Sequence, residues 1–123
     1  MDDLEPGSDT PVQPVDPDIE HVMKCVFGIK PHELRLYRTL SSRPGSTVSE
    51  LASVLERDES SVNRSLSTLA ELDLLDRERR LLEGGGYVYQ YYTGPSVDAK
   101  RRLQAGLEEW VTLVSEEVES LDI

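Results

Sequence analysis

The sequence predicts a mainly helical α+β fold, in which several helices precede a small β-hairpin and a long helix follows it. Three observations predict this fold. Apolar residues recur at helical spacing up to about residue 72 and again from about residue 96. Between these segments lie two strand-like runs joined by three consecutive glycines. The chain has 123 residues, 37% of them hydrophobic, which suits one small domain with a single core.

The first part of the chain divides into a tail and a short helix. Residues 1–17 hold four prolines and five acids, so we expect a flexible acidic tail. A helix is expected to begin after Asp18, which can act as its N-cap, and to end at Gly28. The apolar face of this helix consists of Ile19, Val22, Met23 and Val26.

Two helices follow between residues 31 and 55. Pro31 suits a first helical turn, and the run of Arg, Pro and Gly at residues 43–45 ends that helix. Thr47 and Glu50 then form a capping box, in which each side chain can bond the other's free backbone N–H group. The apolar stripes are Leu34, Tyr37 and Leu40 in the first of these helices, and Leu51, Ala52 and Leu55 in the second.

A third helix is expected at residues 59–72, with Asp58 as its N-cap after a turn at Arg57. Its core stripe is Val62, Leu66, Leu69 and Leu72, and its opposite face is Ser60, Ser61, Asn63, Arg64, Ser67 and Thr68. A short capped helix, a tight turn and a longer helix together have the geometry of a helix-turn-helix, whose second helix enters the major groove of DNA.

Two strands, residues 74–82 and 87–93, are expected to pair as a hairpin with Gly84 to Gly86 at its tip. Gly94 and Pro95 end it, and a helix from about residue 96 to residue 121 follows. We therefore divide the chain into the tail, a DNA-binding domain at residues 18–95, and a dimerisation helix at residues 96–123.

The stretch TVSELASVLERDESSVNRSLSTLAELDLLDRERR, followed by EGGGYVYQYY, resembles archaeal winged helix-turn-helix regulators of the MarR, TrmB and PadR type. The resemblance covers residues 31–93 well and the last helix loosely. These proteins often have glycine where the recognition helix ends, whereas this chain has Asp73. Aspartate tolerates a left-handed backbone better than most residues, so we expect the turn to be preserved. The resemblance implies a transcriptional regulator whose partner is double-stranded DNA.

Candidate DNA contacts lie on the third helix and on the hairpin, which would be the wing. Arginine can bond guanine through two hydrogen bonds, and asparagine can bond adenine in the same way. By resemblance, wing arginines reach phosphates or a narrow minor groove, with Arg79 and Arg80 the preferred contacts. Two alternatives are a merely solvated helix face and an ion-pair ladder with Asp76, Glu78 and Glu83. The predicted contacts are Thr47, Arg57, Ser60, Ser61, Asn63, Arg64, Ser67, Arg77, Arg79, Arg80 and Gly85.

The last helix has a nearly heptad apolar seam that is long for one small domain. We expect it to form a two-fold homodimer, with the helix at residues 19–27 contributing, and the dimer to prefer a near-palindromic operator. The predicted dimerisation residues are Val22, Val26, Leu103, Leu107, Trp110, Val114, Val118 and Leu121.

The net charge of −11 is unusual for a DNA-binding protein. Residues 31–93, with ten acids and eight bases, are the least acidic part. Abundant Asp and Glu with only three lysines resembles the proteins of extreme halophiles, so we interpret the charge as an adaptation to salt rather than a functional acidic tail. K+ or other cations are then expected between the acidic surface and the phosphates. The charge also suits an alternative function, a winged-helix adaptor that binds proteins and not DNA.

Other function classes find little support in the sequence. No glycine motif for phosphate is followed by a lysine and a helix, and no nucleophile has a base at suitable spacing, so we expect neither an enzyme nor a cofactor. His21 and Cys25 are four residues apart, which allows half of a metal site completed across a dimer, a redox-sensitive thiol, or simply a partly buried cysteine near a histidine in a dimer helix; we expect the last, and no metal. No apolar run is long enough to span a membrane, and a cytoplasmic location is expected.

Overall fold

The computed structural model describes residues 9–123. The predicted tail, residues 1–17, lies partly outside the described residues, and its residues 9–17 are exposed and belong to no helix or strand. Four helices precede an antiparallel hairpin, and one long helix follows it. The elements are α1 (Ile19–Phe27), α2 (Pro31–Ser42), α3 (Val48–Leu55), α4 (Glu59–Glu71), β1 (Leu75–Leu81), β2 (Tyr87–Thr93) and α5 (Ser96–Glu119). The predicted fold class is confirmed.

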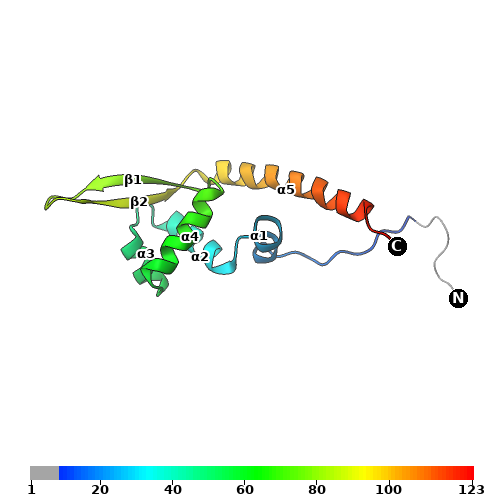
Figure 1. Cartoon of the computed structure of the whole chain (residues 1–123), viewed down its shortest axis with the longest axis horizontal. Helices are drawn as coiled ribbons and strands as arrows, with labels where there is room; N and C mark the ends of the chain where they lie inside the picture. The colour runs from blue at the N-terminus through cyan, green and yellow to red at the C-terminus, as the bar shows by residue number, and fades with distance from the viewer. Residues whose placement is uncertain (1–8) are drawn as a thin grey trace.

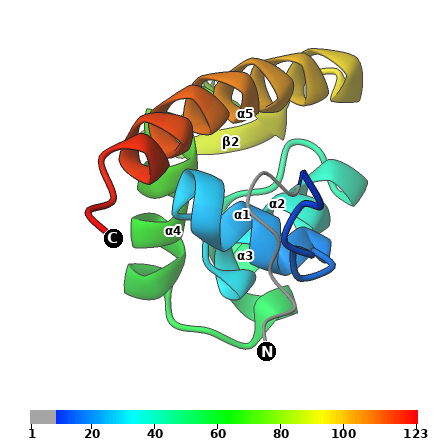
Figure 2. The same ribbon diagram turned by 90° about the vertical axis from the view of Figure 1, so that its right-hand side faces the viewer.

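The hairpin projects from one end of the helical body, and α5 runs from the base of the hairpin toward the opposite end (Figure 1). Seen from that opposite end, α5 crosses above α1 (Figure 2). Within residues 9–123, no helix combines the length and the apolar character that a membrane span requires.

Helix α2 lies at the centre of the core, in contact with α1, α3, α4 and β2. Its fully buried residues are Leu36 and Leu40, whereas Leu34 and Tyr37 are only half-buried. All three residues of the predicted stripe contact the core, and Leu36 is buried in addition to them. Because neighbouring elements cover α2 on several sides, its buried residues include Leu36, which lies off the predicted apolar stripe.

Helix α4 buries the predicted stripe except at its end. Leu72 is the C-cap and 37% exposed, so its assignment to the core was wrong. Asp73 adopts a left-handed φ of 56°, and the amide of Leu74 donates to the carbonyl of Leu69 at 3.1 Å. This turn brings Leu74 into the core in place of Leu72. The buried apolar residues of α4 are Val62, Leu66 and Leu69.

The hairpin is attached to the loop between α2 and α3. The amide of Tyr91 donates to the carbonyl of Ser46 at 2.9 Å, and the amide of Gly45 donates to the carbonyl of Tyr91 at 2.8 Å. Gly45 has a φ of 82°, and a Cβ there would lie 3.2 Å from the Tyr92 hydroxyl, which explains the glycine. Ser46 thus adds a short third edge to the two-stranded sheet.

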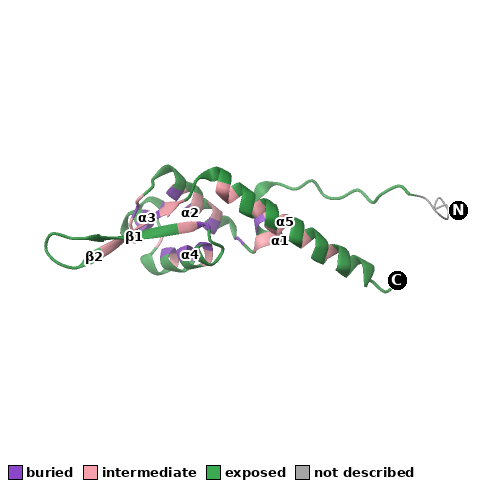
Figure 3. Ribbon diagram, turned by 90° about the horizontal axis from the view of Figure 1, so that it is seen from above, coloured by how far each residue is buried: buried purple, intermediate pink, exposed green. Residues whose placement is uncertain are grey.

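Helix α5 packs on α1, and Gly106 of α5 faces Phe27 of α1. A Cβ at Gly106 would lie 2.7 Å from the ring of Phe27, so only glycine allows the ring to approach this closely. No residue of α5 is buried in the single chain, and exposed positions run along its length (Figure 3). The helix ends at Glu119, so Leu121 lies beyond it, contrary to the predicted extent.

Both predicted caps of the helix-turn-helix are present. The N–H of Glu50 donates to Thr47 Oγ1 at 3.2 Å, and the N–H of Thr47 donates to Glu50 Oε1 at 2.9 Å. The N–H of Ser61 donates to Asp58 Oδ1 at 3.3 Å. Hydrogen bonds from the Thr47 backbone and hydroxyl lower the pKa of Glu50, and hydrogen bonding by the Ser61 side chain and backbone lowers the pKa of Asp58.

These caps predict a loss of stability in acid. A carboxylate whose pKa is lower in the folded than in the unfolded chain stabilises the fold above its ordinary pKa of about 4, and this contribution is lost as the pH falls through the lowered value. The double variant Glu50→Gln, Asp58→Asn cannot titrate at these positions, so its melting temperature should fall less than that of the wild type between pH 6 and pH 3. Equal falls for the two proteins would contradict this assignment.

Candidate nucleic-acid interface

The face of α4 that points away from the core is polar. The Arg64 guanidinium donates to Ser61 Oγ at 3.2 Å, and the Thr68 hydroxyl donates to the carbonyl of Arg64 at 3.2 Å. The first contact extends the arginine along the helix surface rather than into the core. The exposed polar residues of this face are Ser60, Asn63, Arg64 and Ser67, as expected.

Alternation along β1 separates its charges onto two faces. Arg77 is paired with Tyr91, and Arg79 with Tyr89, so these residues share the face that we name the inner wing face. The inner wing face consists of Arg77, Arg79, Leu81, Tyr87, Tyr89 and Tyr91, and the opposite face of β1 consists of Asp76, Glu78 and Arg80. The inner wing face therefore carries two arginines and no acid.

The arginines of the inner wing face stack on tyrosines. The guanidinium carbon of Arg77 lies 3.9 Å from the ring centroid of Tyr89, and that of Arg79 lies 4.9 Å from the centroid of Tyr87. The two rings meet edge-on, with centroids 5.4 Å apart. These distances lie within the range of cation–π attraction.

The alternative of an ion-pair ladder on the hairpin is not what the structure contains. Among residues 9–123, the one ion pair within 4.0 Å joins Arg101 to Asp98 on α5, at 3.5 Å. The three wing arginines thus remain able to bond an external anion. The acids that the alternative required were Asp76, Glu78 and Glu83.

Two adjoining hollows lie between α4 and the inner wing face, and we name them together the contact groove. Asn63, Arg77 and Tyr91 line both hollows, so helix and wing present one continuous surface. The residues that line the contact groove are Thr47, Val48, Ser49, Glu59, Asn63, Leu66, Ser67, Ala70, Arg77, Tyr87, Val88, Tyr89 and Tyr91.

Of the predicted contacts, only Thr47, Asn63, Ser67 and Arg77 line this groove. The Arg57 guanidinium donates to the buried hydroxyl of Ser65 at 3.4 Å, which ties the turn to α4. Arg80 lies on the opposite face of β1. Gly85 is at the tip of the hairpin, with a φ of 96° and open space around it.

Sequence reasoning missed several lining residues. Ser49, Glu59 and the tyrosines of the hairpin were not among the predicted contacts. Strand alternation contained the signal, since Tyr89 and Tyr91 pair across the strands with Arg79 and Arg77, and Tyr87 lies on the same face. Glu59 could be identified as a lining residue only from the folded structure, because no local pattern at the start of α4 shows that the hairpin lies beside it.

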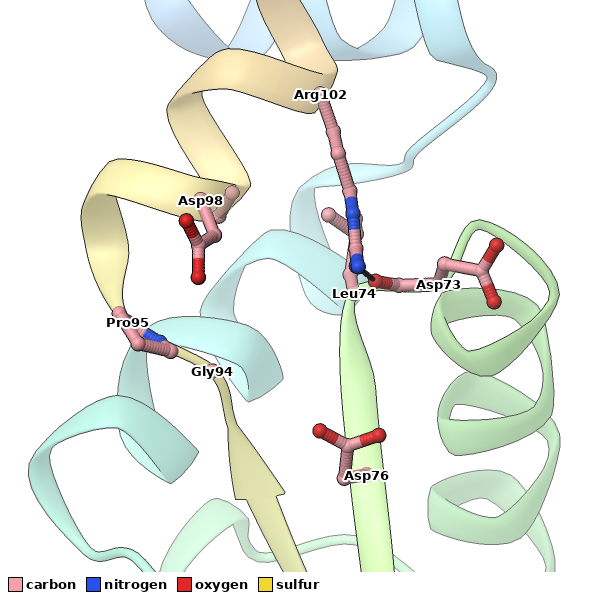
Figure 4. A pocket seen from close by; sticks show the side chains of 8 residues that line it. Asp73, Leu74, Asp76, Gly94, Pro95, Asp98 and Arg102 are labelled. Atoms are coloured by element: carbon pink, nitrogen blue, oxygen red, sulfur yellow. Dashed lines mark hydrogen bonds between the residues drawn. The ribbon is translucent and has the colours of Figure 1, made fainter.

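The end of α4 is tied to α5 at the root of the wing (Figure 4). The guanidinium of Arg102 donates to the carbonyl of Asp73, just after α4 ends. The carboxylates of Asp76 and Asp98 line a hollow beside this hydrogen bond.

A separate apolar cavity lies where α1, α2, α4 and α5 meet. Its lining includes Tyr37, and burial raises the pKa of the Tyr37 hydroxyl.

The predicted dimerisation residues divide into two groups by their exposure. Those near α1 are half-buried within the single chain, whereas Val118 is 65% exposed and Leu121 is 60% exposed. Other apolar side chains of α5, such as Val111 and Leu113, are also exposed. The half-buried members are Val22 and Val26 on α1, and Leu103, Leu107, Trp110 and Val114 on α5.

The pair on α1 lies as its spacing indicates, with 3.6 Å between Cys25 Sγ and His21 Nε2. Both side chains are exposed in the single chain, and burial of Cys25 in a dimer stays a prediction. No group of three or more metal-binding side chains occurs among residues 9–123.

Comparison with known proteins identifies this architecture. The family model described as the sugar-specific transcriptional regulator TrmB matches residues 23–93. An uncharacterized protein of Methanocaldococcus jannaschii is 30% identical over 103 residues, which cover 84% of this chain and 78% of that protein. These relationships extend over most of the described chain.

Solved structures agree with the family. A possible transcriptional regulator from Methanosarcina mazei superposes with a TM-score of 0.74 and 26% identity, covering 85% of this chain and 89% of that one. FabT of Streptococcus pneumoniae, solved in complex with DNA, has a TM-score of 0.52 and 17% identity, covering 84% and 71% of the two chains, and supports the fold alone. The predicted resemblance is confirmed: this chain is a winged-helix protein that belongs to the TrmB family of transcriptional regulators.

Proposed function

We propose that this chain is a homodimeric regulator that binds double-stranded DNA in a sequence-specific way through α4 and the inner wing face. The contact groove carries the proposal, because it joins the polar face of α4 to Arg77, which stacks on Tyr89 and has no carboxylate within 4.0 Å among the described residues. FabT shows that a chain with this fold can hold DNA. Family membership supplies the regulatory role.

Helix α4 supplies the base contacts in this proposal. Arg64 can bond the O6 and N7 atoms of guanine, and Asn63 can bond the N6 and N7 atoms of adenine. Glu59 adds a carboxylate that repels phosphate but accepts a hydrogen bond from the amino group of cytosine. Ser60 and Ser67 are small and exposed, so they permit the helix to approach the groove closely.

A second copy completes the proposed DNA-binding unit. The exposed apolar side chains of α5 extend beyond the part of the helix that α1 covers, and a partner's α5 would remove them from water. A two-fold axis between the copies would present two α4 helices to successive major grooves, which favours a near-palindromic operator. Light scattering in molar KCl should then give about twice the monomer mass of 13.8 kDa; the monomer mass itself would refute the dimer.

The net charge of −11 requires that binding tolerate repulsion from DNA. We infer that K+ or other cations lie between the acidic surface and the phosphates and that the protein works in concentrated salt. Affinity that is steady or rises between dilute and molar KCl would support this; the usual steep fall would oppose it.

The same charge favours one other candidate, an adaptor that binds a basic protein rather than DNA. The two candidates make opposite predictions for a duplex selected from a random pool in molar KCl. A regulator enriches particular sequences, whereas an adaptor enriches none.

The decisive variants lie on α4. Against a duplex selected in this way, the double variant Asn63→Ala, Arg64→Ala should lose about tenfold or more in affinity, since each two-bond base contact contributes about 1–3 kcal/mol. Fluorescence anisotropy in molar KCl measures the loss. The matched control is Arg35→Ala, an exposed arginine on α2 outside the contact groove, which should bind as the wild type does. Undiminished binding by the double variant would remove α4 from the proposed interface.

A further inference from the structure

Arg77 differs from the other arginines of the hairpin in its position. It lies near the root of the wing, where it lines the same hollows as Asn63 and Ser67 of α4. It is exposed, and no carboxylate lies within 4.0 Å of it among the described residues. Arg77 therefore belongs to the surface of α4 rather than to the projecting tip of the hairpin.

Two staggered contacts hold the arginines of the inner wing face. Arg77 is paired across the strands with Tyr91 but stacks on Tyr89, the next tyrosine toward the tip. Arg79 is paired with Tyr89 and stacks on Tyr87 in the same way. Both guanidinium groups thus lean in one direction along the hairpin. Tyr89 is itself half-buried and packed against the core, so it is a fixed support for Arg77.

We propose that Tyr89 is a positioning residue, which holds Arg77 so that its guanidinium edge binds a DNA phosphate beside the groove that α4 enters. This inference rests on the proposed DNA binding. A guanidinium that stacks through its face leaves its N–H groups directed outward, and two of them match two phosphate oxygens.

Fixing the side chain in advance has a particular advantage in this protein. Long-range attraction to phosphate is weak in an acidic chain and weaker still in concentrated salt, where the screening length is about 3 Å at 1 M. Short-range contact must then provide the affinity, and an arginine that is already ordered loses less freedom on binding. The acids of β1, Asp76 and Glu78, lie on the other face and do not compete for Arg77.

The test separates the contributions of the Tyr89 ring, the Tyr89 hydroxyl and the Arg77 charge to DNA affinity. Fluorescence anisotropy measures the affinity of each variant for the selected duplex at several KCl concentrations. Tyr89→Phe keeps the ring and should bind as the wild type does, whereas Tyr89→Leu should lose roughly threefold or more. Arg77→Ala should lose at least as much, and its slope of log affinity against log salt should become more positive by about 0.9, the effect of one phosphate contact. In the Arg77→Ala background, Tyr89→Leu should cause no further loss.

The Arg77→Lys variant keeps the inference testable if Tyr89→Leu does not fold. Lysine keeps the charge but has no planar group to stack or to match two phosphate oxygens, so it should lose affinity as Tyr89→Leu does while its salt slope stays that of the wild type. Arg35→Lys on α2 is the matched control, and circular dichroism confirms folding. The inference is overturned if Arg77→Lys binds as the wild type does, if Tyr89→Phe loses as much as Tyr89→Leu, or if the losses at the two positions add. Failure of the wild type to bind any duplex overturns the proposed function and this inference with it.

Discussion

The burial of one stripe of α4 determines the rest of this structure. Val62 and Leu69 are fully buried, and Leu66 nearly so, against helices that α2 holds together. Because a helix has a fixed periodicity, burying this stripe directs the opposite face, with Asn63 and Arg64, into solvent. The caps at Asp58 and Thr47 fix where the two helices of the motif begin, so the polar face also has a defined position along its axis.

The hairpin contributes a second constraint of the same kind. Side chains alternate along a strand, and the sequence of β1 places its acids on one face and two of its arginines on the other. The bonds of Gly45 and Ser46 to Tyr91 then set the inner wing face beside α4. The molecule can therefore be acidic overall while the surface between α4 and the wing carries exposed arginines. Tyrosines, rather than carboxylates, hold those arginines in place.

Most elements were predictable because their signals are local. Helical spacing, the capping box at Thr47 and the glycine tip of the hairpin act within a few residues, and the elements that they predicted are present. The errors have tertiary causes. Leu36 is buried because α2 is covered on several sides, and Leu72 is exposed because the chain turns at Asp73. The contact of Phe27 with Gly106 joins residues 79 positions apart, and no local pattern indicates it.

We propose above all that α4 and the inner wing face form one DNA-binding surface. Amide chemical shifts of the 15N-labelled protein, recorded with and without a selected duplex in molar KCl, test this claim residue by residue. The account predicts that the shifts change along the exposed face of α4 and at Arg77, Arg79 and Tyr89, with smaller changes at the opposite face of β1. Changes confined to α5, or on α4 without any on the inner wing face, would contradict it.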